Sequence, residues 1–127
     1  MHIEHAALYV TDLEEARYFF EHFLGAKAGS LYHNPKSNFK SYFMSFDEGA
    51  RLEIMTRPEL TGHMRQEFDL GYAHLAFSVG SKERVDLLTK ELVDAGYSCS
   101  SGPRTTGDGY YESVIVALEG NLIEITV

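Results

Sequence analysis

Two stretches of the chain follow the same order of apolar and polar positions. The first is HAALYVTDLEEARYFFEHFLGA, from residue 5, and the second is HLAFSVGSKERVDLLTKELVDAG, from residue 74. Each opens with a histidine in an apolar run of strand-like composition, which predicts a β-strand. Each continues with apolar residues three and four positions apart, which predicts an amphipathic helix. The chain therefore contains an internal repeat, and each copy begins with a strand and a helix.

Capping residues mark where both predicted helices begin and end. Asp12 is the expected N-cap of the first helix and can form a capping box with Glu15, while Ser81 is the expected N-cap of the second. Gly25 and Gly96 stand where helix C-termini favour a left-handed residue. The predicted apolar faces consist of Leu13, Ala16, Phe20 and Phe23 in the first helix and of Val85, Leu88 and Leu92 in the second.

Strand-like runs follow each predicted helix. They cover 40–46 and 51–56 in the first copy, with a weaker run near 27–32, and 97–100, 110–118 and 122–127 in the second. The order strand, helix and three strands predicts a βαβββ module over 1–56 and another over 72–127. Residues 57–71 are the predicted linker, with a short helix around 59–68. The predicted fold class is therefore α+β, with residues 1–127 forming a single domain of two modules.

Composition narrows the classes of partner. The 127 residues carry a formal net charge of −8, and their 11 lysines and arginines are scattered along the sequence. This balance disfavours nucleic acid and anionic membranes, which are bound through basic patches. The sequence has no apolar run long enough for a membrane span and no secretory signal, and its one cysteine fits a reducing compartment. We therefore expect a cytoplasmic protein that acts on a small molecule.

Four polar residues occupy equivalent places in the predicted strands. Because strand side chains alternate between two faces, counting by twos places each residue on one side of the future sheet. His5, Glu53, His74 and Glu124 all lie opposite the apolar positions that would meet the helices. Each module thus has a histidine at the start of its first strand and a glutamate inside its last strand.

Taken singly, each of these residues has an ordinary structural explanation. A strand histidine is commonly satisfied within the fold, and a strand glutamate commonly points to solvent. Two imidazoles and two carboxylates converging from four strands, however, suit a divalent first-row metal, which also compensates the buried charge. We therefore predict a metal site of His5, Glu53, His74 and Glu124. The remaining histidines, predicted as surface residues, are His2, His22, His33 and His63.

The segment 102–111, GPRTTGDGYY, is rich in glycine. One interpretation is a flexible substrate loop in which Arg104 meets an anionic group and Tyr110 or Tyr111 lies beside it. The other is a plain surface turn with an exposed arginine. The segment lacks the helix and the G-K-[ST] signature of a phosphate-binding loop.

The chain resembles the vicinal oxygen chelate superfamily, the group of glyoxalases, bleomycin-resistance proteins and dioxygenases. The resemblance rests on the paired modules and on H-x-x-L-x-V near the N-terminus, L-E-I, G-Y-A-H-L-A-F-S-V and G-N-L-I-E-I, and it covers essentially the whole chain. It implies a glyoxalase-like fold in which each module curls into a cupped mixed sheet, a partial barrel. It also implies a metal in the cup, often at a homodimer interface.

Within this superfamily, the set His5, Glu53, His74 and Glu124 is similar to the ligand set of glyoxalase I, lactoylglutathione lyase. This resemblance implies the conversion of a hemithioacetal, formed from a 2-oxoaldehyde such as methylglyoxal and a thiol, to a 2-hydroxyacyl thioester. It implies that Glu124 is the main base and that Glu53 is a ligand and second base. Four ligands with two open positions favour nickel, cobalt, manganese or zinc.

The sequence departs from the glyoxalase I pattern at one position that bears on which thiol is used. Bacterial glyoxalase I commonly has an arginine where this chain has Tyr9, and that arginine helps to hold the glutathione carboxylate. Tyrosine offers a hydrogen bond without a charge. The thiol cosubstrate, glutathione or another, therefore stays open, with Tyr9, Arg104 and Tyr110 as the expected substrate-binding residues.

Two alternatives remain. The first is another activity on the same metal site: thiol transfer to an epoxide antibiotic, a dioxygenase reaction or an epimerisation. The second is a protein that sequesters a small molecule or antibiotic.

Overall fold

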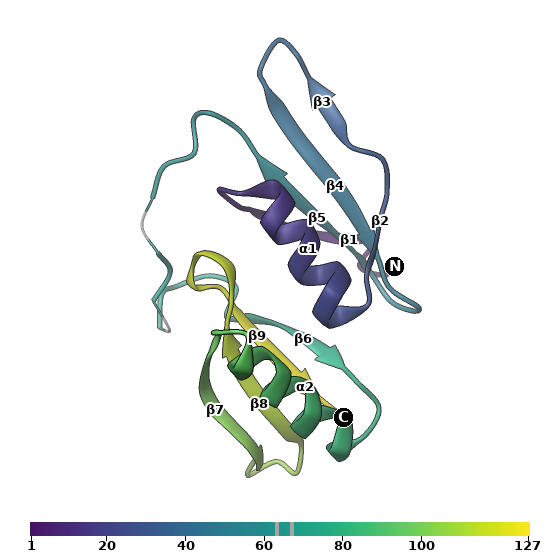
Figure 1. Ribbon diagram of the computed structural model, residues 1–127, viewed down its shortest axis with the longest axis vertical. Coiled ribbons are helices and arrows are strands. Elements are labelled where there is room, and N and C mark those ends of the chain that lie inside the picture. Colours follow the sequence, from purple (N-terminus) through teal and green to yellow (C-terminus); the bar gives the residue numbers. More distant parts are fainter. Residues whose placement is uncertain (63, 67) are drawn as a thin grey trace. The chain divides into compact units, whose positions relative to one another are not determined.

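The computed structural model describes residues 1–62, 64–66 and 68–127. The chain divides into two compact units, Met1–Gly62 and His63–Val127. The boundary between them falls inside the segment 57–71 that was predicted as a linker. Figure 1 shows the elements of both units.

The first unit is a mixed sheet with one helix. Its elements are β1 (His5–Tyr9), α1 (Leu13–Leu24), β2 (Lys27–Ala28), β3 (Tyr32–Asn34), β4 (Phe39–Ser45) and β5 (Arg51–Thr56). The strand order is β1-β5-β4-β2, and β3 pairs with β4 beside this path. Strand β1 runs parallel to β5, whereas the other pairs are antiparallel.

The second unit repeats this plan. Its elements are β6 (His74–Ser78), α2 (Lys82–Asp94), β7 (Ser98–Thr105), β8 (Tyr111–Val116), the 3₁₀ turn η1 (Leu118–Gly120) and β9 (Leu122–Thr126). The strand order is β6-β9-β8-β7, with β6 parallel to β9. The two sheets therefore have the same connectivity, and β3 is an addition in the first unit. The α+β class and the paired βαβββ modules are confirmed.

The helices begin and end at the predicted caps. The Asp12 carboxylate accepts a hydrogen bond from the Glu15 backbone N–H at 2.9 Å, and the Ser81 hydroxyl accepts one from the Arg84 N–H at 3.3 Å. Gly25 closes α1 in the left-handed region, with φ of 66°. Each cap satisfies a backbone group that the helix leaves unpaired, which contributes about 1 kcal/mol at an N-cap.

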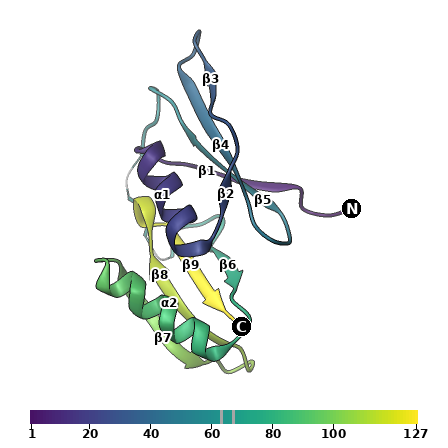
Figure 2. The same cartoon turned by 45° about the vertical axis from the view of Figure 1, so that its right-hand side comes forward.

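Each helix covers one face of the sheet in its own unit, as both views show (Figures 1 and 2). The buried side chains include Phe19, Phe20, Met44 and Ile54 in the first unit and Val85, Leu92, Ile115 and Ile125 in the second. Burial of each such side chain contributes roughly 1.5–3 kcal/mol. Along β5, β8 and β9 buried and half-buried positions alternate, so the face opposite the helix carries the polar residues.

Two predicted segments differ from the structure. The described residues within 59–68 form no helix, and Gly62, at φ of 136°, has a backbone conformation outside the helical region. The predicted loop 102–111 is also wrong in its first part, because β7 continues to Thr105 through two register shifts against β8. Gly102 permits this pairing: its φ is +81°, and a Cβ there would lie 2.4 Å from the Glu112 carbonyl oxygen.

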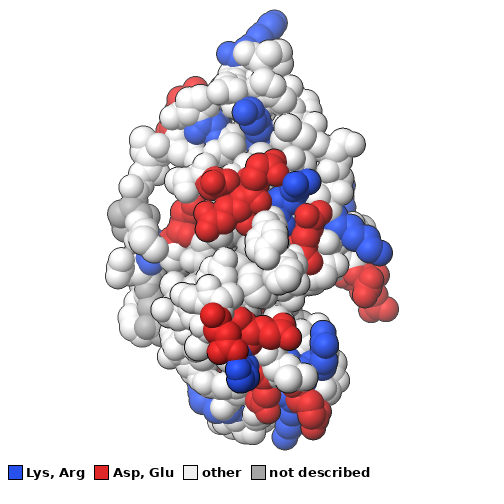
Figure 3. All heavy atoms as spheres, viewed as in Figure 1, with Lys and Arg blue, Asp and Glu red and all other residues white. Residues whose placement is uncertain are grey.

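Neither helix is long and apolar enough to cross a membrane, as judged over the described part of the chain. On the face drawn in Figure 3, lysine and arginine atoms are interspersed with acidic and uncharged ones. The described residues on this face form no continuous basic patch.

Candidate functional site

The face of each sheet opposite its own helix, here called the open face, carries the predicted site residues. In the first unit, β1 and β5 place His5, Tyr9 and Glu53 on this face, because their strand neighbours Leu52 and Ile54 are buried on the other. In the second unit, β6 and β9 place His74 and Glu124 there, opposite Ile123 and Ile125. The alternation read from the sequence is therefore confirmed in both units.

The strand register is the same in the two units. Glu53 in β5 pairs with the residue two positions after His5 in β1. Glu124 in β9 pairs with the residue two positions after His74 in β6. Because residues two apart share a face, each histidine and its glutamate are diagonal neighbours across a parallel strand pair.

The second unit brings its pair into contact. The Nε2 atom of His74 lies 3.2 Å from Oε2 of Glu124. The Glu124 side chain is 15% exposed and that of His74 is 40% exposed. The carboxylate is thus largely withdrawn from water, while the imidazole remains accessible.

In the first unit the two residues have different surroundings. The ring of His5 meets the ring of Phe43 edge-on, with centroids 5.4 Å apart. Glu53 is half-buried, and the hydrogen bonds and ion pairs of the described residues do not include its carboxylate. A half-buried carboxylate without such partners is a candidate for binding a cation.

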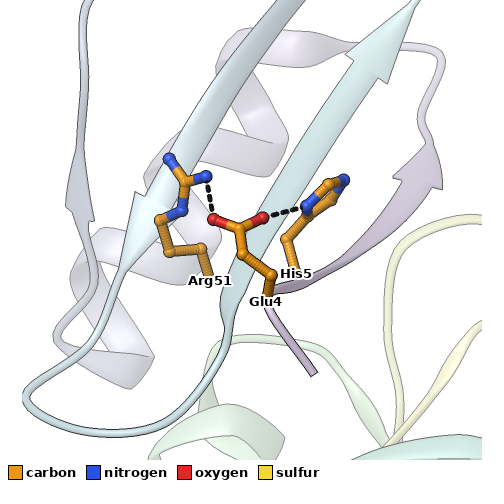
Figure 4. A network of polar contacts seen from close by, with 3 residues as sticks. All are labelled: Glu4, His5 and Arg51. Carbon is orange, nitrogen blue, oxygen red and sulfur yellow. Dashed lines mark hydrogen bonds and ion pairs between the residues drawn. The ribbon is translucent and has the colours of Figure 1, made fainter. Parts of the chain in front are cut away.

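His5 belongs to a network of three residues with Glu4 and Arg51 (Figure 4). The carboxylate of Glu4 contacts the Nδ1 atom of His5 through one oxygen and the guanidinium of Arg51 through the other. These two hydrogen bonds hold the pKa of the Glu4 carboxyl below its ordinary value. The Arg51 guanidinium also lies 4.2 Å from the centre of the Phe43 ring.

A second carboxylate lies beside Glu124. Burial raises the pKa of the Glu112 carboxyl above its ordinary value, and the nearby charge of Glu124 adds to this effect. Arg104 pairs with Glu112 in the register of β7 and β8, and its charge opposes the shift. The Arg104 Nε–H donates to the Ser101 hydroxyl at 3.0 Å. Arg104 is therefore a strand residue near this acidic pair, not a loop residue.

Tyr9 lies half exposed on β1. Its hydroxyl forms a hydrogen bond with Arg57, whose Nε–H also donates to Glu59 at 2.9 Å. The bonds to Glu59 and Tyr9 raise the pKa of the Arg57 guanidinium. The guanidinium of Arg57 thus lies beside Tyr9, the position at which bacterial glyoxalase I commonly has an arginine.

The two tyrosines of the predicted loop face different surroundings. Tyr110 is 59% exposed in the turn after β7. The Tyr111 hydroxyl donates to Asp86 of α2 at 2.7 Å, and this bond raises the pKa of the Tyr111 phenol. Tyr111 therefore belongs to the helix-covered side of the sheet, and the suggestion that it could flank a substrate beside Arg104 is wrong.

The donor set of each pair fits a divalent metal. Ligands bind such ions at about 2.0–2.2 Å, so two neighbouring ligands of one ion lie about 3 Å apart. The separation of 3.2 Å between His74 and Glu124 matches this spacing. Among the described residues no three His, Cys, Asp or Glu side chains form a metal-binding group.

Three of the four other histidines are exposed, as predicted: His2, His22 and His33. His33 bonds Asn38 through Nε2 at 2.9 Å, and His22 stacks on Tyr18. The prediction for His63 lies outside the described residues.

Sequence reasoning missed Glu4, Arg51 and Glu112. Period-two counting would have placed Glu112 on the same face as Val114 and Val116, and thus on the side of Glu124. Glu4 and Arg51 are far apart in sequence, so their contact follows only from the parallel pairing of β1 with β5.

Comparisons with known proteins agree with this architecture. The profile of the Glyoxalase/Bleomycin resistance protein/Dioxygenase superfamily matches residues 2–125. No curated protein sequence matches the chain. A solved structure described as a possible glyoxalase from Bacillus cereus is 24% identical, with a TM-score of 0.71 and coverage of 100% of this chain and 99% of that one.

Two further solved structures share the fold. The trypanothione-dependent glyoxalase I of Leishmania major is 19% identical, with a TM-score of 0.79 over 99% of this chain and 86% of that one. A glyoxalase family protein from Bacillus cereus is 18% identical, with a TM-score of 0.85 over 99% and 93% of the two chains. The profile match spans nearly the whole sequence, and the repeated modules have the expected connectivity. The chain therefore belongs to the Glyoxalase/Bleomycin resistance protein/Dioxygenase superfamily.

Proposed function

We propose that the protein is a metal-dependent isomerase of the glyoxalase I type. It converts the hemithioacetal of a 2-oxoaldehyde and a thiol to a 2-hydroxyacyl thioester. The observation that carries this proposal is the repeated histidine–glutamate pair on the open faces, in the same register in both units. Superfamily membership alone does not select a reaction, because one fold supports many chemistries.

The proposed metal ligands are His5, Glu53, His74 and Glu124. The carboxylate of Glu53, without a hydrogen-bond partner among the described residues, is available to a cation, and Glu124 already lies beside the Nε2 atom of His74. When bound, a nickel, cobalt or zinc ion supplies Lewis-acid stabilisation of the negative charge that develops on substrate oxygens.

Glu124 is the proposed base. The reaction moves one proton from a carbon of the substrate to the adjacent carbon, so it needs no oxidant or reductant. A largely buried carboxylate at the edge of the substrate can accept that proton and return it. Glu112, whose own carboxyl pKa is raised by burial and by the charge of Glu124, lies beside this proposed base. Glu53 is the proposed second base.

The substrate-binding residues proposed are Tyr9, Arg104 and Tyr110. Arg57 is hydrogen-bonded to Tyr9 and ion-paired with Glu59, so an anionic group of the thiol would compete with Glu59 for this guanidinium. Glutathione is the first thiol to test, and trypanothione, used by the solved Leishmania major enzyme, is the second. We further propose that the protein is a cytoplasmic homodimer.

The decisive experiment measures thioester formation by the nickel-reconstituted protein with methylglyoxal pre-equilibrated with glutathione. We expect turnover that is lost on chelation and restored by nickel. Glu124→Gln should lower kcat about 10²–10⁴-fold, because a neutral amide cannot accept the proton. The matched control is Glu48→Gln, which removes a charge from an exposed loop and should leave turnover unchanged.

The other outcomes select among the alternatives. A protein that holds its metal but forms no thioester with either thiol would contradict the isomerase and favour antibiotic thiol transfer, oxygenation or epimerisation. A folded protein that binds no divalent metal would contradict the metal site as well. That result would favour a protein that sequesters a small molecule.

A further inference from the structure

We propose that Glu4 is a positioning residue that fixes the tautomer of His5, so that the Nε2 atom of this ring faces the metal. This inference rests on the proposed function, because it assumes that His5 is a metal ligand. Glu4 itself touches neither metal nor substrate in the proposal. It acts through the imidazole.

The contact between Glu4 and His5 defines which ring nitrogen carries the proton. A carboxylate only accepts hydrogen bonds, so a neutral imidazole facing it must donate through Nδ1–H. The lone pair then resides on Nε2, and Nε2 has no hydrogen bond within the described part of the chain. The network in Figure 4 thus leaves Nε2 as the nitrogen that can bind a metal.

In the second unit, the ring atom that faces the neighbouring proposed ligand is Nε2. There the Nε2 atom of His74 lies 3.2 Å from the Glu124 carboxylate. A metal bound at this pair would replace the proton between Nε2 of His74 and the Glu124 carboxylate, so Nε2 would be the ligating atom in both units. The edge-on contact of His5 with Phe43 further restricts the orientation of its ring.

Glu4 is itself held in place from two directions. Its second carboxylate oxygen pairs with the Arg51 guanidinium. The Arg51 backbone N–H also donates to the Glu4 carbonyl oxygen at 3.1 Å, which continues the pairing of β1 with β5. Arg51 is the register partner of His5, so the strand pairing determines where Glu4 meets the imidazole.

The expected consequence is tighter metal binding. A carboxylate on the outer nitrogen of a ligating histidine orients the ring and raises its basicity, and its loss typically lowers metal affinity about 10–100-fold. Removal of Glu4 should therefore weaken the site without removing any ligand. Replacement of His5 itself should weaken it more.

The test combines nitrogen NMR of the histidine rings in metal-free protein with nickel affinity measured by chelator competition. The spectra are recorded at a pH at which each histidine ring carries a single proton, which the nitrogen signals themselves report. In the unmodified protein we expect His5 in the Nδ1–H form. In Glu4→Leu we expect this preference to be lost and nickel affinity to fall about 10–100-fold. Glu4→Gln, which keeps a carbonyl acceptor, should retain the tautomer and more of the affinity.

Two controls isolate the effect. Glu48→Gln removes a distant loop charge and should change neither readout. His33, bonded to Asn38, should keep its own signals in every variant and so reports that the first unit remains folded.

Each remaining outcome overturns a defined part of the proposal. An unchanged His5 tautomer in Glu4→Leu would show that Glu4 does not select it. A lost tautomer with unchanged nickel affinity would show that the selection does not serve the metal. If the unmodified protein binds no nickel, the proposed function fails, and the role of Glu4 toward a metal fails with it.

Discussion

Tyr42 illustrates how a polar atom is accommodated in the core of the first unit. The residue is 7% exposed, and its hydroxyl donates to Glu14 of α1 at 2.7 Å. Arg17 lies over the ring at 5.3 Å and forms an ion pair with Glu14 at 3.1 Å. The bond to Glu14 raises the pKa of the Tyr42 phenol, because ionisation would place two negative charges side by side.

Tyr42→Phe should therefore change stability in a pH-dependent way. The folded chain keeps the phenolic proton to a higher pH than the unfolded chain. The stabilisation is thus fully present below the unfolded pKa, about 10, and is lost as the pH rises through the folded pKa. We expect the variant to lose about 1 kcal/mol at neutral pH and to show a shallower decline above pH ~10. Urea unfolding across this range measures both effects.

The matched control is Tyr32→Phe. Tyr32 is exposed on β3, so the variant should keep the alkaline decline of the unmodified protein. A Tyr42→Phe protein with the same alkaline profile as the unmodified protein would contradict the assigned role of the phenol.

At the scale of elements, each helix is attached to its sheet mainly by apolar packing, with one buried polar contact in the second unit. The Thr89 hydroxyl of α2 donates to the Val85 carbonyl oxygen at 2.6 Å. Its proton is thus used within the helix, so the Ser113 hydroxyl of β8 must donate to Thr89, at 2.6 Å. Both side chains are buried, at 5% and 0% exposed. This contact fixes the position of α2 against the strand that also carries Glu112.

A double-mutant cycle tests this contact. Ser113→Ala should lower the free energy of unfolding by about 1 kcal/mol, and Thr89→Val by about 1–3 kcal/mol because it leaves the Ser113 hydroxyl buried without its acceptor. The double variant should cost about 1 kcal/mol less than the sum of the two, since the same bond is removed only once. Strictly additive losses, measured by urea unfolding, would show that the two hydroxyls are not coupled.

At the scale of the whole molecule, the two units have the same strand order and the same placement of a histidine and a glutamate. Each unit contributes half of the proposed ligand set. The two halves can therefore come from one chain or from two chains of a dimer. A closed dimer would pair equivalent surfaces of two identical chains. This leads to a prediction specific to the proposed homodimer.

Two inactive variants should complement each other if the site forms across the dimer. One carries His5→Ala and Glu53→Ala, and the other carries His74→Ala and Glu124→Ala. A mixed dimer then contains one intact site, so refolding the two together should restore about a quarter of the metal sites. Nickel binding by equilibrium dialysis measures the recovery. Zero recovery in a protein that forms mixed dimers would show that all four ligands come from one chain.

Most secondary structure could be predicted because its signals are local. Asp12 and Gly25 bound α1 through hydrogen bonds and dihedral angles of adjacent residues. The predicted apolar face of the first helix did not include Phe19, which is fully buried. The width of a buried helix face depends on the elements that cover it, and periodicity alone does not give that width. The extension of β7 past Gly102 likewise depends on pairing with β8, and glycine and proline there suggested a loop.

The sequence by itself determined the modular repeat, the helix caps and the face on which His5, Glu53, His74 and Glu124 lie. These features follow from periodicity and from contacts between residues close in the chain. Only the tertiary structure decided that Glu4 meets His5, that Glu112 meets Glu124 and that Tyr111 turns toward α2. The physical reason is that these contacts depend on the pairing of strands and the packing of a helix far apart in sequence. Periodicity and capping signals report only on residues close in the chain, so they do not predict these contacts.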